Sequence, residues 1–247
     1  WRAMYDYDDI IISSGLTATM NGAKILVWDS GNNRWRYTET KNSVQLVSYD
    51  IQSVSETLYG LTAFSQTAPD QSIIWDSLTV VITDPADNHI NIGTVAVGIT
   101  ASVMYNYDSQ PYTGTYSLNN TQFTYNTAQR RGYTVNSVAG DDAYGITYIA
   151  VTDSTYCIWN SITIIITDPY SQTLTVGENA TGIFVTAHYD YGSWTYNGVI
   201  NLNNTQFMYT TAGQRGYTVS SVSDDSFGIT TIRQNDVTYC VWLHDVV

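Results

Sequence analysis

Basic residues are scarce in this chain of 247 residues. Lysine and arginine together number 9, against 22 aspartates and glutamates, which gives a formal net charge of -13. Lysine occurs only as Lys24 and Lys41. A surface for nucleic acid needs clustered Lys and Arg, and anionic lipid headgroups would repel so acidic a chain. We therefore expect no nucleic acid among its partners.

Long apolar runs are also missing. The longest, such as residues 162–166, fall far short of the roughly 18 residues that cross a bilayer, so we expect no membrane insertion. The given sequence does not open with a signal-peptide pattern and begins with Trp1 rather than Met, so we expect a mature product or a piece of a longer protein. Only 13% of the residues are charged but 43% are hydrophobic, which predicts a packed core rather than disorder.

What the sequence does contain is a repeat of about 84 residues. Two ladders of aromatic residues mark it, with spacings of 84, 84, 84 and 83: Tyr49, Tyr133 and Tyr217, then Trp75, Trp159 and Trp242. The motif LNNTQF occurs at 118–123 and 202–207, and ITDP occurs at 82–85 and 166–169. Because a fixed period indicates repeated structural units, we predict three domains. They are repeat 1 (1–75), repeat 2 (76–159) and repeat 3 (160–247).

Within a repeat, the hydrophobic pattern has a period of two rather than 3.6. In repeat 2, the β-branched run 78–83 ends at Asp84-Pro85, and further short strand-like segments follow between Gly, Asn and Asp clusters. Seven or so strands in a unit of this length are typical of an Ig-like sandwich. We predict an all-β fold of tandem Ig-like β-sandwich domains, in which repeat 1 is divergent and short of its first strand.

These repeats resemble the tandem Ig-like domains of prokaryotic cell-surface proteins, above all archaeal S-layer-type and extracellular filament proteins. The resemblance rests on the ITDP strand end, the segment 91–96, LNNTQF, GYTVxSV and the closing TYC[IV]W of repeats 2 and 3. Repeat 1 shares it in part, through an echo of 98–104 in 15–20. The resemblance implies a fold and an extracellular, cell-surface location rather than an activity.

The recurrent residues are interpreted first as structural. The closing tryptophans predict anchors at the end of each core, with a sugar-stacking face as the alternative. Tyr59, Tyr144 and Phe227 share one position before a glycine, and we expect their rings to pack. Cys157 and Cys240 also share one position, where repeat 1 has Ile73. Equivalent residues of separate domains lie too far apart for a disulfide, so we predict two buried free thiols.

Nothing in the sequence indicates catalysis. The three histidines His89, His188 and His244 fall at unrelated repeat positions, and no nucleophile elbow, CxxC motif or phosphate loop occurs. We therefore expect no enzyme, no cofactor and no catalytic metal. Asp84 and Asp168 before proline could bind calcium between domains, but such an Asp more often begins a turn.

Three sequons are candidate glycosylation sites: Asn119, Asn179 and Asn203. Asn119 and Asn203 occupy the same repeat position, on an expected turn, and a glycan there would shield exposed strand edges. A glycan is therefore a candidate partner of the chain.

The two ends of the chain suggest self-association. Repeats 2 and 3 open with clear strands at 78–83 and 162–167, whereas repeat 1 has no clear counterpart. Repeat 3 runs on into residues 243–247, where a next opening strand would begin, which makes Leu243, Val246 and Val247 candidate subunit contacts. The chain is then either a window of a longer repeat protein or a filament subunit whose tail completes its neighbour. Alternatively, Trp1–Tyr5 is itself the opening strand.

The sequence thus predicts a structural extracellular protein, a rod or filament of Ig-like domains that associates head to tail. The alternative is an adhesin stalk or a module that binds carbohydrate or another partner. Trp28, Trp35 and Trp194 break the repeat pattern and are the candidate contact residues for that alternative.

Overall fold

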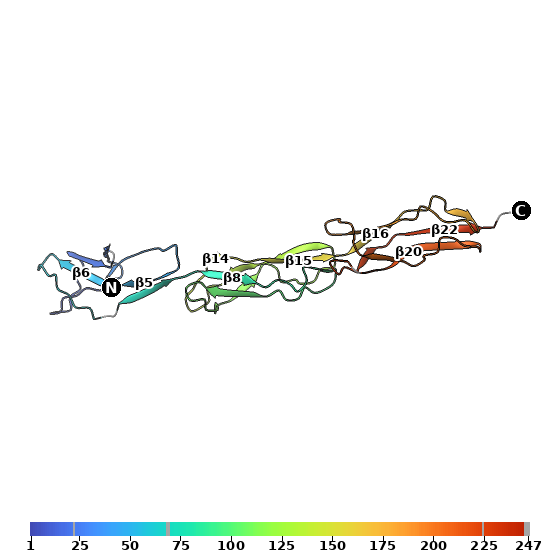
Figure 1. Ribbon diagram of the computed structural model, residues 1–247. Helices are drawn as coiled ribbons and strands as arrows, with labels where there is room; N and C mark the ends of the chain where they lie inside the picture. The colour runs from blue at the N-terminus through green and yellow to red at the C-terminus, as the bar shows by residue number, and fades with distance from the viewer. Residues whose placement is uncertain (22, 68–69, 224, 245–247) are drawn as a thin grey trace. The chain divides into compact units, whose positions relative to one another are not determined.

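Every regular element that the structure describes is a β-strand. The computed structural model describes residues 1–21, 23–67, 70–223 and 225–244, and Figure 1 shows the order of the strands along the chain. The predicted all-β fold of tandem β-sandwiches is confirmed. By its internal contacts the chain divides into two compact units. Unit 1 holds residues 1–79, 104–113 and 142–150, and unit 2 holds 80–103, 114–141 and the described part of 151–247.

Repeat 3 shows the complete sandwich. Its strands are β16 (Ile162–Ile166), β17 (Thr173–Thr175), β18 (Val185–Tyr189), β19 (Val199–Leu202), β20 (Gly213–Ser223), β21 (Ile232–Gln234) and β22 (Val237–Leu243). One sheet has the order β18-β16-β21 and the other has the order β17-β22-β20-β19. Side chains of both sheets form one core, to which β16 gives Ile162, Ile164 and Ile166 and β20 gives Val219 and Val222. The period-two pattern of the sequence places the three isoleucines of β16 inward, while Ile165 points outward.

Repeat 2 follows the same plan. Its strands are β8 (Leu78–Ile82), β9 (His89–Asn91), β10 (Ala101–Tyr105), β11 (Tyr116–Leu118), β12 (Gln129–Tyr133), β13 (Val135–Val138), β14 (Ile149–Val151) and β15 (Thr155–Asn160). The sheets have the orders β10-β8-β14, β11-β13 and β12-β15-β9. The strands β8 and β16, which open these two repeats, are called opening strands below.

Repeat 1 contains β1 (Leu16–Met20), β2 (Lys24–Ile25), β3 (Val27–Asp29), β4 (Arg34–Arg36), β5 (Gln45–Tyr49), β6 (Ile51–Glu56) and β7 (Gln71–Trp75). Its sheets have the orders β2-β1-β6, β3-β4 and β5-β7. The three domain boundaries proposed from the sequence stay a prediction.

The start of the chain is not an opening strand. Residues 1–12 match 101–112 and 185–196 in their backbone pattern: the Tyr5, Tyr105 and Tyr189 amides donate to the carbonyls of Ile10, Gln110 and Trp194 at 3.1, 2.9 and 2.9 Å. The same turn puts Asp9, Ser109 and Ser193 at φ of 55°, 60° and 53°. Trp1–Tyr5 is therefore the counterpart of β10 and β18. The interpretation of this segment as the opening strand is wrong.

The echo between residues 15–20 and 98–104 is also wrong in register. β1 pairs with β6 as β11 pairs with β13 and β19 with β20, each with a bulge at the same place. Repeat 1 then departs from the others between Asn21 and Tyr49, which are 28 residues apart where Asn119 and Tyr133 are 14 apart. The added residues form the strands β2, β3 and β4, and they hid the correct alignment.

Candidate functional site

The linker between repeats is held by one recurring arrangement. The Asn160 carboxamide oxygen accepts hydrogen bonds from the backbone N–H groups of Ser161 and Tyr191, at 3.0 and 2.8 Å. Asp76 repeats this with Ser77 and Tyr107, at 2.7 and 2.9 Å. Each of these linker residues directly follows the closing tryptophan of a repeat and is tied to the Tyr-x-Tyr loop of the next one. We call this arrangement the linker joint.

A polar side chain at the centre of the Tyr-x-Tyr loop completes the linker joint. In repeat 3 it is Asp190, which accepts from the hydroxyls of Ser161 and Thr163 and from Arg233 Nε at 2.9 Å. Burial alone would raise the pKa of Asp190, but these hydrogen bonds outweigh it and hold the pKa below its usual value. In repeat 2 the uncharged Asn106 takes this place, bonded to Ser77 and Thr79.

Repeat 1 has the same loop, at residues 5–7. Its residues Tyr5-Asp6-Tyr7 correspond to 105–107 and 189–191, and Tyr7 is 97% exposed where Tyr107 is 40% exposed. Asp6 is exposed as well. Within the described residues no linker lies against this loop. Repeat 1 therefore presents the receiving half of a linker joint to solvent.

A second open feature of repeat 1 is the edge of β7. The pair β5–β7 has the register of β12–β15, with Tyr49 opposite Gln71 as Tyr133 lies opposite Thr155. In repeats 2 and 3 a further strand lies parallel on the other side, β9 on β15 and β17 on β22. Among the described residues β7 has no such neighbour. The open edge of β7 thus corresponds to the edge of β15 that β9 covers in repeat 2 and to the edge of β22 that β17 covers in repeat 3.

The closing tryptophans differ accordingly. Trp159 and Trp242 are fully buried, and their Nε1–H groups donate to the carbonyls of Thr94 and Glu178 at 2.8 and 3.0 Å. Trp75 is only partly buried, and its Nε1 is shielded from solvent and has no hydrogen-bond partner among the residues that the structure describes. The predicted role of a core anchor is therefore seen in repeats 2 and 3. In repeat 1 the residues that would complete it are not in place.

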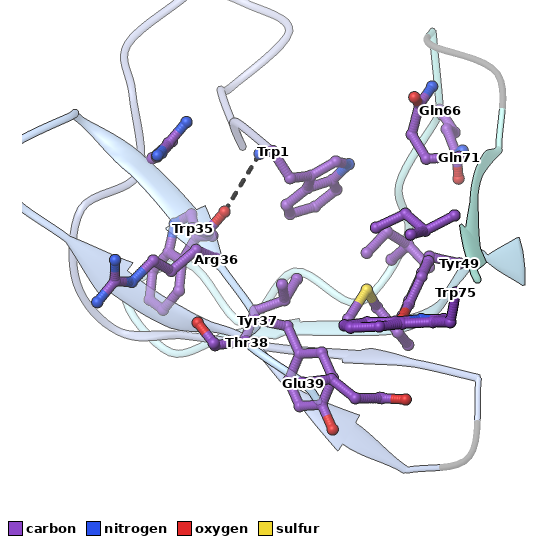
Figure 2. Close-up of a pocket in the computed structure, with 15 residues that line it drawn as sticks. Trp1, Trp35, Arg36, Tyr37, Thr38, Glu39, Tyr49, Gln66, Gln71 and Trp75 are labelled. Carbon is purple, nitrogen blue, oxygen red and sulfur yellow. Dashed lines mark hydrogen bonds between the residues drawn. The ribbon is translucent and has the colours of Figure 1, made fainter. Parts of the chain in front are cut away.

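In repeats 2 and 3, residues 87–96 and 171–180 pack along this edge and on the closing tryptophan, and we call them the covering segments. At the corresponding place in repeat 1 lies an apolar pocket of about 590 Å³. Figure 2 shows Trp1, Trp35, Tyr49 and Trp75 around it, with the Trp1 amino group bonded to the Trp35 carbonyl at 3.2 Å. Ile73 also lines it and is 48% exposed, whereas its counterparts Cys157 and Cys240 are fully buried. The prediction that this position is buried holds for the cysteines and is wrong for Ile73, because the segment that covers the cysteines has no counterpart over Ile73.

Glu39, which lines the pocket, pairs with both lysines of the chain. Lys24 Nζ lies 2.7 Å from a carboxylate oxygen of Glu39, and Lys41 also pairs with Glu39. Hydrogen bonds from Lys24 and Lys41 lower the pKa of Glu39 to about 2. The lysines are thus neutralised locally, so the rim adds polarity to the pocket without making a basic patch.

Other residues singled out in the sequence have structural contacts. Asp84 and Asp168 accept hydrogen bonds from Thr155 and Thr238, about 70 residues away in each case, and so tie strands together. Within the described ranges, no group of three or more His, Cys, Asp or Glu side chains could hold a metal ion. Nor does any helix there have the length and apolarity to cross a membrane.

The two cysteines are free and buried, as predicted. Burial raises the pKa of the Cys157 thiol to about 11 and also raises that of Cys240. The Sγ atoms contact the carbonyls of Asp87 and Ser171, at 3.6 and 3.9 Å, within the covering segments of repeats 2 and 3. A thiolate would be strongly disfavoured at these sites, so the cysteines serve as small core residues.

The aromatic candidates separate by exposure. Trp35 is buried, with its Nε1 donating to the Ile12 carbonyl at 2.7 Å, and Trp28 packs against it at a ring separation of 5.6 Å. Trp194 is 51% exposed. As expected, the rings at the position before glycine pack on the first tyrosine of each Tyr-x-Tyr loop: Tyr59 on Tyr5, Tyr144 on Tyr105 and Phe227 on Tyr189, with ring separations of 5.4, 5.6 and 5.5 Å. Tyr59 and Tyr144 nevertheless stay exposed, while Phe227 is partly buried.

The sequons and the tail lie at the surface where the structure describes them. Asn119, Asn179 and Asn203 are exposed. The side-chain oxygens of Asn119 and Asn203 accept from the N–H groups of Thr134 and Thr218, at 2.9 and 2.8 Å. Leu243 ends β22 and is half exposed. Val246 and Val247 lie outside the described residues, so their predicted role in subunit contact stays a prediction.

Sequence reasoning missed the open edge of β7 and the exposed Tyr-x-Tyr loop. The Tyr-x-Tyr pattern, which occurs at 5–7, 105–107 and 189–191, was the signal that could have found them.

Comparison with known proteins adds little. Neither a protein-family model nor a curated protein matches the chain. Among solved structures, the crystal structure of mouse protocadherin-24 EC1-3 is similar to it with 8% sequence identity and a TM-score of 0.35. The similarity covers 96% of this chain and 92% of that one. We draw no functional conclusion from a likeness at this level.

Proposed function

We propose that this chain is a structural extracellular protein whose repeats continue head to tail into a rod or filament on a prokaryotic, archaeal cell surface. One observation carries the proposal. The Tyr-x-Tyr loop that receives a linker in repeats 2 and 3 is exposed in repeat 1 at Asp6 and Tyr7. The contact that joins repeats inside the chain is thus ready to be used once more at its head.

In this proposal the tail of a preceding chain takes the place of a linker against this loop, and it contacts the loop through its backbone, since Leu243 lacks the side-chain oxygen of Asp76 and Asn160. Leu243 follows Trp242 as Asp76 follows Trp75 and as Asn160 follows Trp159. The proposed subunit contacts are therefore Leu243, Val246 and Val247, set against residues 1–7 of the next chain. Backbone hydrogen bonds of an added strand give such a contact its strength, and a head-to-tail contact that does not close forms an open fibre.

A mechanical role rather than a catalytic one is supported by how the polar side chains are used. Asp84, Asp168 and Asp190 are bonded to hydroxyls of other segments, and Asp142 and Asp225 accept from the hydroxyls of Tyr105 and Tyr189 at 2.7 and 2.8 Å. These bonds hold strands and loops together. The exposed sequons fit a glycosylated outer surface, and we propose Asn119, Asn179 and Asn203 as glycan carriers.

An adhesin stalk or carbohydrate-binding module is the second candidate. The exposed Trp194 favours it, because this indole stands beside Tyr191 with a ring separation of 6.5 Å and could stack on a sugar. Trp28 and Trp35 no longer support it, since their rings pack against each other and Trp35 is buried. Trp194→Ala should abolish glycan binding if this function holds and should leave assembly unchanged.

The test of the main proposal is concentration-dependent assembly, followed by sedimentation velocity and negative-stain imaging. Asp6→Ala should weaken assembly about tenfold, because His244, which takes the place of Ser77 and Ser161 in the tail, loses a carboxylate acceptor for its imidazole N–H. Asp87→Ala, which removes the same charge from another exposed site, is the matched control and should assemble normally. A chain that stays monomeric at high concentration, and that is unchanged by deletion of residues 243–247, would contradict the proposal.

A further inference from the structure

We infer that repeat 1 is an acceptor for an added β-strand of a partner polypeptide, which lies parallel to β7, fills the pocket at Trp75 and reaches onto the loop 144–148. The partner strand has the chemistry of residues 87–96: alternating apolar side chains, with an asparagine between two of them. The inference rests on the proposed function only for the presence of a neighbouring chain beside repeat 1, because the tail 243–247 contains no asparagine and is not this strand. The site itself rests on contacts within the chain.

The first support is the filled site of repeat 2. The Ile158 N–H donates to the Asn88 carbonyl at 2.8 Å, and the Ile92 N–H donates to the Asn160 carbonyl at 2.9 Å, so the segment is bonded along β15. Trp159 then donates to the Thr94 carbonyl. The apolar side chains of this covering segment pack on the buried ring of Trp159 and its neighbours: Ile90, Ile92 and Ala96.

Repeat 3 fills its site in the same way. The Val241 N–H donates to the Gln172 carbonyl at 2.8 Å, and the Val176 N–H donates to the Leu243 carbonyl at 3.0 Å. Leu174, Val176 and Ala180 pack in the core of Trp242. Two independent copies thus show that this edge, this pocket and this indole N–H take one extended strand.

In repeat 1 every receiving group has its counterpart. β7 offers the edge, with Ile74, Trp75 and Asp76 in the places of 158–160. The apolar pocket of about 590 Å³ takes the place of the packed side chains, and the unpartnered Trp75 Nε1 lacks the carbonyl acceptor that the other two indoles have. A buried N–H without an acceptor costs free energy that a bound carbonyl would recover.

The second support comes from the contacts that β9 of repeat 2 makes with repeat 3. The Asn91 Nδ2 donates to the Gly228 carbonyl at 3.1 Å, and Asn91 Oδ1 accepts from the N–H groups of Thr230 and Thr231, both at 2.8 Å. His89 stacks on Phe227 with a ring separation of 4.1 Å and an interplanar angle of 11°. The covering segment therefore also fixes the neighbouring repeat.

The counterparts of these contacted groups in repeat 2 are exposed. Gly145, Thr147 and Tyr148 correspond to Gly228, Thr230 and Thr231, and Tyr144 corresponds to Phe227. Tyr144 and Tyr148 are 74% and 69% exposed. If a strand paired with β7 in the register that β9 has on β15, its asparagine would lie opposite Asp76 and next to the loop 144–148. The partner is thereby specified as a strand with His-x-Asn at its end.

The test uses a blocked synthetic peptide of residues 86–97 added to the whole chain. We expect saturable binding by calorimetry, with NMR shifts of the Trp75 indole N–H and of the Thr147 and Tyr148 amides. An Asn91→Ala peptide should bind about tenfold more weakly, since three hydrogen bonds are lost. The equivalent peptide of residues 170–181, which has Thr173 and Thr175 in place of His89 and Asn91, should bind more weakly for the same reason.

Two further variants separate the site from non-specific adhesion. A peptide N-methylated at Ile92 keeps every side chain but loses the edge hydrogen bond, and it should bind at least tenfold more weakly. Trp75→Phe in the chain should weaken binding several-fold. Equal binding of a scrambled peptide, or binding of the 86–97 peptide without shifts at Trp75 and Tyr148, would overturn the inference.

The outcomes of this experiment distinguish a failure of the acceptor site from a failure of the proposed function. If the peptide binds while the chain never assembles, the filament proposal falls and the acceptor site stands. If the chain assembles but the 86–97 peptide neither binds nor competes, the acceptor site falls and head-to-tail assembly stands.

Discussion

One tryptophan position has two different roles in this chain. Trp159 and Trp242 have a hydrogen-bond acceptor, a T-shaped neighbour (Tyr125 and Tyr209) and complete burial. Trp75 has the same sequence context but lines an open pocket. The difference comes from a segment elsewhere in each repeat, so no local pattern around the tryptophan could have revealed it.

Alanine substitution should distinguish these roles. Trp159→Ala should lower the free energy of unfolding by about 3–5 kcal/mol, because it empties a packed core and removes a buried hydrogen bond. Trp75→Ala should cost about 1–2 kcal/mol, since its ring has fewer packing partners to lose. Denaturant unfolding followed by circular dichroism measures both. Equal losses would mean that Trp75 is as well packed in solution as Trp159.

At the scale of elements, the opening strands and linker joints build the repeat. β16 is bonded to β18 and β21 and is tied to the Tyr-x-Tyr loop through Ser161 and Thr163, which links strand pairing directly to the linker. The central residue of the Tyr-x-Tyr loop is the carboxylate Asp190 in repeat 3 and the uncharged amide Asn106 in repeat 2. This loop position should therefore contribute acid sensitivity in repeat 3 and none in repeat 2.

The folded-state pKa of Asp190 lies below its unfolded value, so ionised Asp190 stabilises the folded state. This contribution is complete above an unfolded pKa near 3.9 and is lost as the pH falls through the folded pKa. Asp190→Asn, which copies Asn106, should remove the acid dependence that arises from this site. Thermal melting of both proteins between about pH 5 and pH 2 tests it. Identical pH profiles would rule out Asp190 as a source of acid sensitivity.

The elements were predictable where the chain repeats itself, and not where repeat 1 is rearranged. The alternation in residues 78–83 and 162–167 predicted the two opening strands, and the shared cysteine position predicted buried thiols. The extra residues between Asn21 and Tyr49 broke the 84-residue spacing upstream of them. A chance echo of Gly98–Met104 then outweighed the short Tyr-x-Tyr signal, which placed Gly15–Met20 one strand too early.

At the scale of the whole molecule, two kinds of contact join one repeat to the next. The linker joint ties each closing tryptophan to the next Tyr-x-Tyr loop, and the covering strand of repeat 2 reaches onto repeat 3 through Asn91. Repeat 1 exposes the Tyr-x-Tyr loop and the β7 edge, and repeat 2 exposes residues 144–145 and 147–148, the counterparts of the groups that Asn91 and His89 contact in repeat 3. The proposed assembly would engage the open loop, the open β7 edge and the Trp75 indole together.

The most direct test is electron cryo-microscopy of the native assembly, at a resolution that separates strands. We predict a continuous strand parallel to β7, with a carbonyl within hydrogen-bond distance of Trp75 Nε1 and an asparagine on residues 145–148. A map in which β7 faces solvent and the pocket at Trp75 stays open, within an ordered assembly, would contradict the account.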